Sequence, residues 1–218
     1  MLYTIQNTRQ HTVYKDSKGN KLVGTTTALG ILAKPALYRW YFEQGKSGED
    51  PFRVKDIAAD IGTIAHALIM CNLHGWELDR SNLVPENISR AENSVISYLE
   101  WEKGKKIQPV IIESQLVDES LGYGGTVDLY ADIDSEKVLV DFKTGKGIWP
   151  EMHYQVAAYW NLLEINGHMV DKAVILNIPK DETTDFQTKT FTDMTREFKI
   201  FRHCLAIYKL QKEKNGTV

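Results

Sequence analysis

The sequence predicts a single α/β domain in which helices surround a mixed sheet. Within residues 108–145, apolar side chains recur at every second position over three consecutive segments, a pattern typical of antiparallel strands. On both sides of this region, apolar residues recur at three- and four-residue intervals, as they do on the buried face of a helix. A chain of 218 residues, of which 43% are hydrophobic and 25% charged, is long enough to bury one core of this kind.

The N-terminal part is predicted to form a hairpin over residues 1–24 and a helical region over residues 25–105. Strand-like segments surround an Asp-Ser-Lys-Gly-Asn turn, in which Gly and Asn tolerate a positive φ. In the helical region, Thr and Pro residues stand where helices start. The expected elements are strands over 2–7 and 11–23, and helices over 28–33, 36–45, 52–70 and 85–105.

The region 106–180 is predicted to form the central sheet, and residues 181–218 to add one strand and a closing helix. An antiparallel meander is followed by a crossover helix and a buried strand, which together make a mixed sheet. The expected elements are strands over 108–118, 124–133 and 137–145, a helix over 150–167, strands over 172–179 and 185–192, and a helix over 194–214. No repeat or linker divides the chain, so residues 1–218 are expected to form one domain.

The composition excludes several kinds of protein. A net charge of -3 and a pI near 6.1 give no overall basic field, so any contact with nucleic acid has to come from a local patch. No apolar run approaches the length of a membrane span and no leader follows Met1, so we expect a cytoplasmic protein without a membrane partner. Cys71 and Cys204 lack the CxxC spacing of metal sites, and we expect both to be packing residues.

The segment VDFKTGKG, which begins at Val140, places two charges inside an apolar strand. Asp141 and Lys143 share one face of this strand, whereas Val140 and Phe142 lie on the other. One interpretation is a solvated strand face with an ion pair of little consequence for stability. A phosphate-binding loop is excluded, because that motif needs Gly at the position of Val140 and Ser or Thr at the position of Gly147.

A second interpretation brings in the preceding strand. There Asp128 lies on the face opposite to Val127 and Leu129, so Asp128 and Asp141 converge if the two strands are neighbours. Two converging carboxylates repel each other, and a divalent cation with oxygen ligands relieves that repulsion. The sequence therefore predicts a metal site on this face of the sheet.

Four motifs, read in chain order, point to a family. They are Gly62-Thr-Ile-Ala-His66 on a helix, Gly125-Thr-Val-Asp128 and Asp141-Phe-Lys143 on neighbouring strands, and Gln155-Val-Ala-Ala-Tyr159 on the next helix. In order and in element type they resemble the RecB-type branch of the PD-(D/E)XK nuclease superfamily. The resemblance implies a restriction-endonuclease-like core, and residues 24–40 are similar to the initial segment of phage exonucleases of that branch.

The resemblance implies a site for Mg²⁺ or Mn²⁺. Its ligands would be the carboxylates of Asp128 and Asp141, the backbone carbonyl of Phe142 and the imidazole of His66, with Glu113 as an additional candidate. An imidazole ligand favours Mn²⁺ over Mg²⁺. The alternative for His66 is a core histidine, since its helix also buries apolar neighbours.

The resemblance also assigns roles to residues beyond the metal ligands. Lys143 would orient or help deprotonate the attacking water and stabilise charge on the scissile phosphate. Gln155 and Tyr159, one helical turn apart, would support the site and contact the DNA backbone. The alternative for Tyr159 is a core position.

A further hypothesis concerns the segment from Thr25 to Arg39. Thr25, Thr26 and Thr27 come just before a predicted helix, and Lys34 and Arg39 follow nearby. Hydroxyl groups and free N–H groups at a helix start can bind phosphate, so these five residues are candidates for holding the DNA backbone. The alternative is a capping turn without a ligand.

The expected activity is metal-dependent hydrolysis of linear DNA, duplex preferred and single strands accepted, by an exonuclease of phage recombination or DNA repair. The alternatives are a structure- or site-specific endonuclease on the same core, and an inactive DNA-binding module, which intact Asp128, Asp141 and Lys143 disfavour. Two cysteines cannot hold the iron–sulfur cluster of the CRISPR-adaptation nucleases in this branch. A single-strand annealing protein and further copies of the chain are candidate partners besides DNA.

Overall fold

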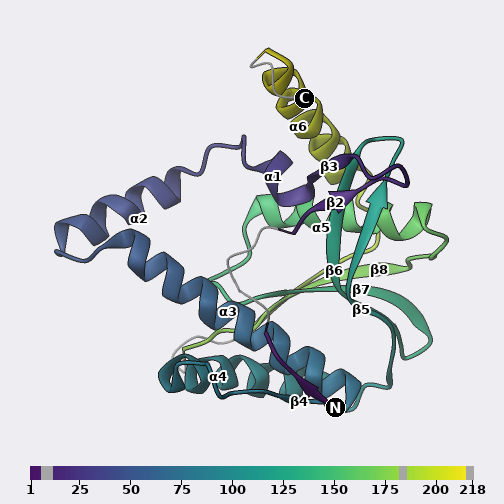
Figure 1. Cartoon of the computed structure of the whole chain (residues 1–218). Helices are drawn as coiled ribbons and strands as arrows, with labels where there is room; N and C mark the ends of the chain where they lie inside the picture. The colour runs from purple at the N-terminus through teal and green to yellow at the C-terminus, as the bar shows by residue number, and fades with distance from the viewer. Residues whose placement is uncertain (6–11, 182–185, 215–218) are drawn as a thin grey trace.

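The computed structural model describes residues 1–5, 12–181 and 186–214 (Figure 1). Its helices are α1 (Thr25–Leu29), α2 (Pro35–Lys46), α3 (Pro51–His74), α4 (Pro85–Glu102), α5 (Pro150–Ile165) and α6 (Thr195–Lys214). Its strands are β1 (Leu2–Tyr3), β2 (Tyr14–Lys15), β3 (Lys21–Gly24), β4 (Glu77–Leu78), β5 (Ile107–Asp118), β6 (Tyr123–Ile133), β7 (Glu136–Lys143), β8 (Lys172–Asn177) and β9 (Gln187–Phe191).

The central sheet is mixed, as the sequence predicts. Strands β5, β6 and β7 form an antiparallel meander, and β8 returns parallel to β7 after the crossover helix α5. The order across the sheet is β2-β3-β6-β7-β8-β9, with β5 on the second edge of β6. This is the restriction-endonuclease-like arrangement of a mixed sheet flanked by helices.

Strand β6 changes partner along one of its edges. β5 pairs with one edge over nearly the whole length of β6, so β7 and β3 must share the other edge. β7 pairs from Leu129 to Ile133, and β3 pairs only at Tyr123 and Gly124. Within the described part of the chain, the stretch 125–128 therefore has no strand partner on this edge. The sheet opens there, and Asp128 lies at the opening.

Helices cover both faces of the sheet (Figure 1). Residues of α1, α5 and α6 pack with one set of strand residues, which includes Leu139 and Ile175. Residues of α3 and α4, among them Tyr98 of α4, pack with the alternate set, which includes Val140 and Leu176. This division follows from the alternation of side chains along a strand, and it confirms the buried faces predicted for β7 and β8.

Helices α2, α3, α4 and α5 start where the sequence has proline. Pro35, Pro51, Pro85 and Pro150 each occupy the first turn, where a missing N–H costs no hydrogen bond. In α3, the Asp50 carboxylate also accepts a hydrogen bond from the Phe52 N–H at 2.9 Å, which is a regular N-cap.

The N-terminal hairpin is only partly as predicted. β2 pairs with β3 around the expected turn, and β3 joins the central sheet. Leu2 and Tyr3 do not pair with this hairpin, because β1 pairs in parallel with β4, a two-residue strand that the sequence did not predict. Residues 6–11 and 182–185 lie outside the described part of the chain, so the predicted strand ends there are not tested.

Helix α3 contradicts the prediction that no apolar run approaches the length of a membrane span. It has 24 residues, and its most apolar window has a mean hydropathy of 1.3, which is enough by length and composition alone. In the structure α3 packs on α4 and β4, and Ile61, Ile64 and Ile69 of α3 are buried. A buried core helix passes the same composition test.

Candidate active site

Asp141 is a buried carboxylate without a hydrogen bond. Only 1% of the residue is exposed, and neither carboxylate oxygen accepts a hydrogen bond from the described residues. The Lys143 ammonium lies 2.5 Å from Oδ2, as an ion pair without hydrogen-bond geometry. A desolvated carboxylate in this state is unfavourable unless a further cation reaches it.

Asp128 spans the opening between β6 and β7. The β6–β7 ladder ends at the pair Leu129–Val140, and the next free N–H of β7, that of Phe142, donates to Asp128 Oδ2 at 2.8 Å. This bond holds the Asp128 carboxylate beside β7, where it interacts electrostatically with Asp141. β6 and β7 are neighbouring strands, which is the condition that the predicted convergence requires.

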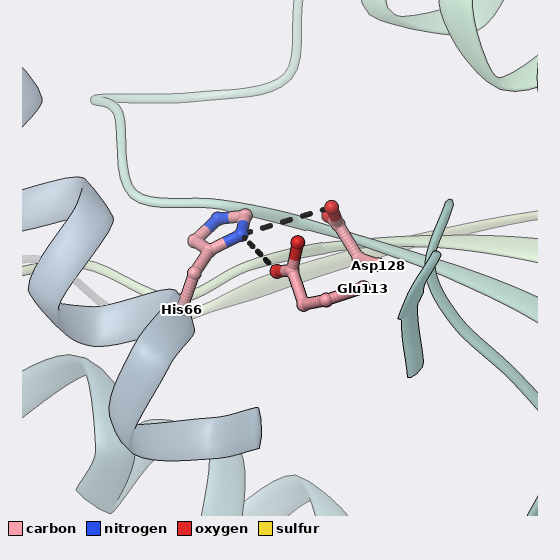
Figure 2. A group of neighbouring side chains, drawn as sticks. All are labelled: His66, Glu113 and Asp128. Atoms are coloured by element: carbon pink, nitrogen blue, oxygen red, sulfur yellow. Dashed lines mark hydrogen bonds and ion pairs between the residues drawn. The ribbon is translucent and has the colours of Figure 1, made fainter. Parts of the chain in front are cut away.

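His66 approaches Asp128 and Glu113 from α3. Figure 2 shows its ring pointing at Glu113 and Asp128, with Nδ1 3.3 Å from Glu113 Oε1 and 3.7 Å from Asp128 Oδ1. The three side chains offer ligand atoms that all lie within 4.8 Å of one another. Gly62, one turn earlier on α3, leaves room for Thr144, whose Oγ1 would lie 2.9 Å from an added Cβ.

Glu113 has a strained backbone. Its φ of 44° lies in the left-handed region, which is costly for a residue other than glycine, at about 1–3 kcal/mol. Its neighbours Ile112 and Ser114 still pair with β6, so the irregularity is confined to this residue, at the level of Asp128. Strain of this kind persists where the surrounding structure requires a particular side-chain direction, and here that direction is toward His66.

The pKa values of His66, Asp128 and Asp141 are all raised, so the cluster favours bound protons. Burial would lower the pKa of His66, but the charges of Asp128 and Glu113 raise it to about 9. Burial raises the pKa of Asp141 to about 6, against the opposing effect of the Lys143 ammonium. Burial likewise raises the pKa of Asp128. The donor set of carboxylate oxygens and one imidazole nitrogen fits Mg²⁺ or Mn²⁺.

Gln155 and Tyr159 lie behind the carboxylates on α5. The Gln155 amide donates to the Tyr159 hydroxyl at 2.8 Å, and only 5% of Tyr159 is exposed. Burial and the charges of Asp141 and Asp128 raise the pKa of Tyr159 well above its usual value. Gly125 makes room for this ring, because an added Cβ would lie 2.4 Å from it. Tyr159 is thus a buried support of the site, which corrects its expected contact with DNA.

The candidates for DNA contact are dispersed. Thr25 is buried, and its hydroxyl donates to the Gly124 carbonyl at 2.9 Å, so it holds α1 against the sheet and is withdrawn as a phosphate contact. Thr26 and Thr27 are exposed on the same short helix. Lys34 pairs with Glu151 at the start of α5, at 3.3 Å. Arg39 is exposed on α2, which extends away from the sheet (Figure 1).

Sequence reasoning missed Tyr14 and Asn177. The Tyr14 hydroxyl is 3.0 Å from Thr126 Oγ1, and the ring lies against Gly124, where an added Cβ would meet it at 2.6 Å. Tyr14 therefore closes one side of the opening in the sheet. Asn177 ends β8 beside Lys143 and is fully buried. A polar residue at the end of an otherwise apolar strand was the signal that could have identified it.

Comparisons with known proteins give distant structural likenesses. No protein-family model and no curated protein matches the sequence. Among solved structures, SSO0001 is 10% identical over 59% of this chain, with a TM-score of 0.35, and the chain spans 62% of its length. A candidate exonuclease from Eubacterium rectale is 12% identical over 72% of this chain and 69% of its own, with a TM-score of 0.45. An alkaline exonuclease from Laribacter hongkongensis is 13% identical over 89% of this chain and 93% of its own, with a TM-score of 0.40.

Two of these three proteins are named as exonucleases. At these identities and TM-scores, however, the likeness does not identify a substrate or a reaction. The proposed function therefore rests on the geometry of the site itself.

Proposed function

We propose that the protein is a divalent-metal-dependent deoxyribonuclease that degrades linear DNA from its ends, in phage recombination or DNA repair. The observation that carries the proposal is the state of Asp141, a buried carboxylate that is paired with the Lys143 ammonium and accepts no hydrogen bond from the described residues. The charges of Asp128 and His66 act on it, and these two residues form a cluster of possible metal ligands with Glu113. Lys143 follows Asp141 two residues later on the same strand. A fold maintains such a carboxylate at a cost in stability, which indicates that it serves a ligand.

The cation would be held by Asp128, Asp141 and His66, with Glu113 and the Phe142 carbonyl as further ligands. A bound divalent cation would lower the pKa of a water molecule and neutralise charge on the scissile phosphate. His66 must release its proton before Nδ1 can act as a ligand, because only the neutral ring has a free lone pair. The carboxylates that raise its pKa hold it in place until then.

Lys143 supplies the remaining positive charge in the site. Its side chain is 17% exposed, and its ammonium, which pairs with Asp141, would reach a phosphate oxygen bound beside that carboxylate. Gln155 donates one N–H to Tyr159, which leaves its second N–H for a phosphate oxygen and its amide oxygen for a water molecule. These residues orient the reacting groups, which is the main contribution a protein makes to phosphoryl transfer.

DNA binding needs local contacts, since the chain carries a net charge of -3. Thr26, Thr27, Lys34 and Arg39 remain the candidates for backbone contacts. If Arg39 binds phosphate, Arg39→Ala should weaken DNA binding uniformly across sequences and reduce its dependence on salt. A variant with unchanged affinity and salt dependence would remove Arg39 from the interface.

A comparison of closed circular and linear DNA tests the function. With Mg²⁺ or Mn²⁺, an exonuclease degrades the linear form and spares the closed circle, an endonuclease nicks the circle, and a binding module leaves both intact. The control is Asp141→Asn, which keeps the shape of the side chain and removes its charge. Linear DNA that survives the wild-type protein with either metal, or that Asp141→Asn degrades at the wild-type rate, would contradict the proposal.

A further inference from the structure

Asn177, the last residue of β8, is a fully buried amide without a partner. It is 0% exposed, and neither Oδ1 nor Nδ2 forms a hydrogen bond with the described residues. Most buried polar side chains have at least one partner, because an unpaired amide loses its hydration without compensation. An isolated exception within a hydrophobic strand therefore calls for a functional explanation.

The position of Asn177 connects it to the proposed active site. In the parallel β7–β8 pair, Asn177 lies next to Lys143 and Ile175 lies next to Asp141. Ile175 and Leu139 both pack on the α5 side of the sheet, so alternation places Asp141, Lys143 and Asn177 on that same face. Neighbouring strands are about 4.8 Å apart, which is within the reach of a lysine side chain.

Lys143 requires a second acceptor if a metal binds. In the metal-free structure its ammonium contacts Asp141 Oδ2, an oxygen that a divalent cation would also take. Two cations at one carboxylate repel each other strongly in a buried setting. Asp128 is no alternative, since Oδ2 already accepts from the Phe142 N–H and Oδ1 faces His66. On the β8 side of Lys143, its register partner is Asn177, whose amide forms no hydrogen bond with the described residues.

We propose that Asn177 is a positioning residue for Lys143. When a divalent cation binds to Asp141, the Asn177 carbonyl oxygen accepts a hydrogen bond from the Lys143 ammonium and keeps it beside the scissile phosphate. The unpaired amide of the metal-free structure is thus the acceptor for the second position of the lysine. This inference rests on the proposed function, since it needs a metal at Asp141.

A double-mutant cycle on Mn²⁺ affinity tests the proposal by calorimetry. Asn177→Leu removes the acceptor with little change in shape, so Lys143 would stay on Asp141 and compete with the metal. We expect the variant to bind Mn²⁺ about threefold more weakly or worse, on the scale of coupled neighbours. In a Lys143→Met background there is no ammonium to place, and Asn177→Leu should leave the Mn²⁺ affinity unchanged. Asn177→Leu should likewise slow DNA cleavage when Lys143 is present and leave the cleavage rate unchanged in the Lys143→Met background.

The melting temperature distinguishes a positioning role of Asn177 from a purely structural one. Because Asn177→Leu replaces an unpaired buried amide by an apolar side chain, its melting temperature in EDTA should equal or exceed that of the wild type. Asn161 is the matched control: its amide donates to Asp118 and to Tyr123 at 3.1 and 2.9 Å, so Asn161→Leu should melt lower and bind Mn²⁺ normally. If Asn177→Leu does not fold, Asn177→Thr and Asn177→Val replace it, because these two variants match each other in shape. Only the Thr variant keeps an oxygen acceptor, so only it should retain the Mn²⁺ affinity.

Two results would overturn the inference. Equal effects of Asn177→Leu in both backgrounds, with metal binding and cleavage by the wild type intact, would reject the role of Asn177 and leave the proposed function standing. A wild-type protein that neither binds Mn²⁺ nor cleaves DNA would reject both.

Discussion

Replacing Asp141 with asparagine should stabilise the metal-free protein while it abolishes metal binding. Burial raises the pKa of Asp141 from 3.8 to about 6, so the folded protein resists the loss of this proton and the unfolded chain does not. The difference corresponds to about 3 kcal/mol at most, because one pH unit is equivalent to about 1.4 kcal/mol. For a chain of this length, the melting temperature should rise by about 6–12 °C.

The gain should depend on pH in a defined direction. A raised carboxyl pKa costs no stability below the unfolded value of 3.8, and the full cost is present above about 6. Asp141→Asn should therefore gain more at about pH 8 than at about pH 4.5. Thermal unfolding in EDTA at the two pH values measures this. Adding Mn²⁺ should raise the melting temperature of the wild type and leave the variant unchanged.

Asp132 provides the control on the same sheet. Its side chain is partly exposed and bonded to Lys137, and this hydrogen bond lowers its pKa, so Asp132→Asn should not stabilise the protein. If Asp141→Asn melts below the wild type at about pH 8, or gains equally at both pH values, the carboxylate is not a source of instability and the reasoning fails.

Three further predictions address the packing, charge and chemistry of the site. Gly125→Ala should cost about 1–3 kcal/mol of stability, since its Cβ would lie 2.4 Å from the Tyr159 ring, whereas Gly145→Ala, with no atom within 4 Å, should leave the melting temperature unchanged. In the metal-free protein, stability should fall as the pH rises from 6.5 through about 9, because folded His66 keeps a proton that the unfolded chain releases; denaturation of His66→Gln should lack this decline. Lys143→Met should bind Mn²⁺ in calorimetry and cleave DNA about 10²-fold more slowly, and a loss of Mn²⁺ affinity would instead assign the lysine to assembly of the site.

Much of the fold follows from the periodicity of the sequence. A period of two over β5–β7 and helical spacing in α3, α4 and α5 are strong signals because each pattern repeats along a long element, even though β6 and β7 are buried on both faces. The two-residue strands β1 and β4 carry no such signal, since two residues define no period. Their pairing depends on the path of the chain beyond α3, which no local pattern encodes.

The alternation of faces predicted for β6 holds at Leu129 and fails at Val127. Leu129 packs with Val140, as expected, but Val127 packs in the cluster on the α5 side. The exception falls where β6 leaves β7 and approaches β3, so the strand does not keep one regular ladder on this edge. Sequence alternation assumes a continuous ladder, and it therefore loses accuracy where the candidate site requires the sheet to open.

The opening in the sheet explains why one site draws on both helical layers. A continuous β6–β7 ladder would separate α3 from α5, and His66 could not share a carboxylate with the Gln155–Tyr159 pair. At the opening, Asp128 faces His66, and its charge still acts on Tyr159. The local rules of stable structure fail in the same region: Glu113 has a positive φ within a strand, and the buried Asp141 carboxylate and Asn177 amide form no hydrogen bond with the described residues. Unfavourable features that are gathered at one point and offset by the rest of the core indicate a ligand that resolves them, and under the proposed function a divalent cation beside DNA would do so for the carboxylates.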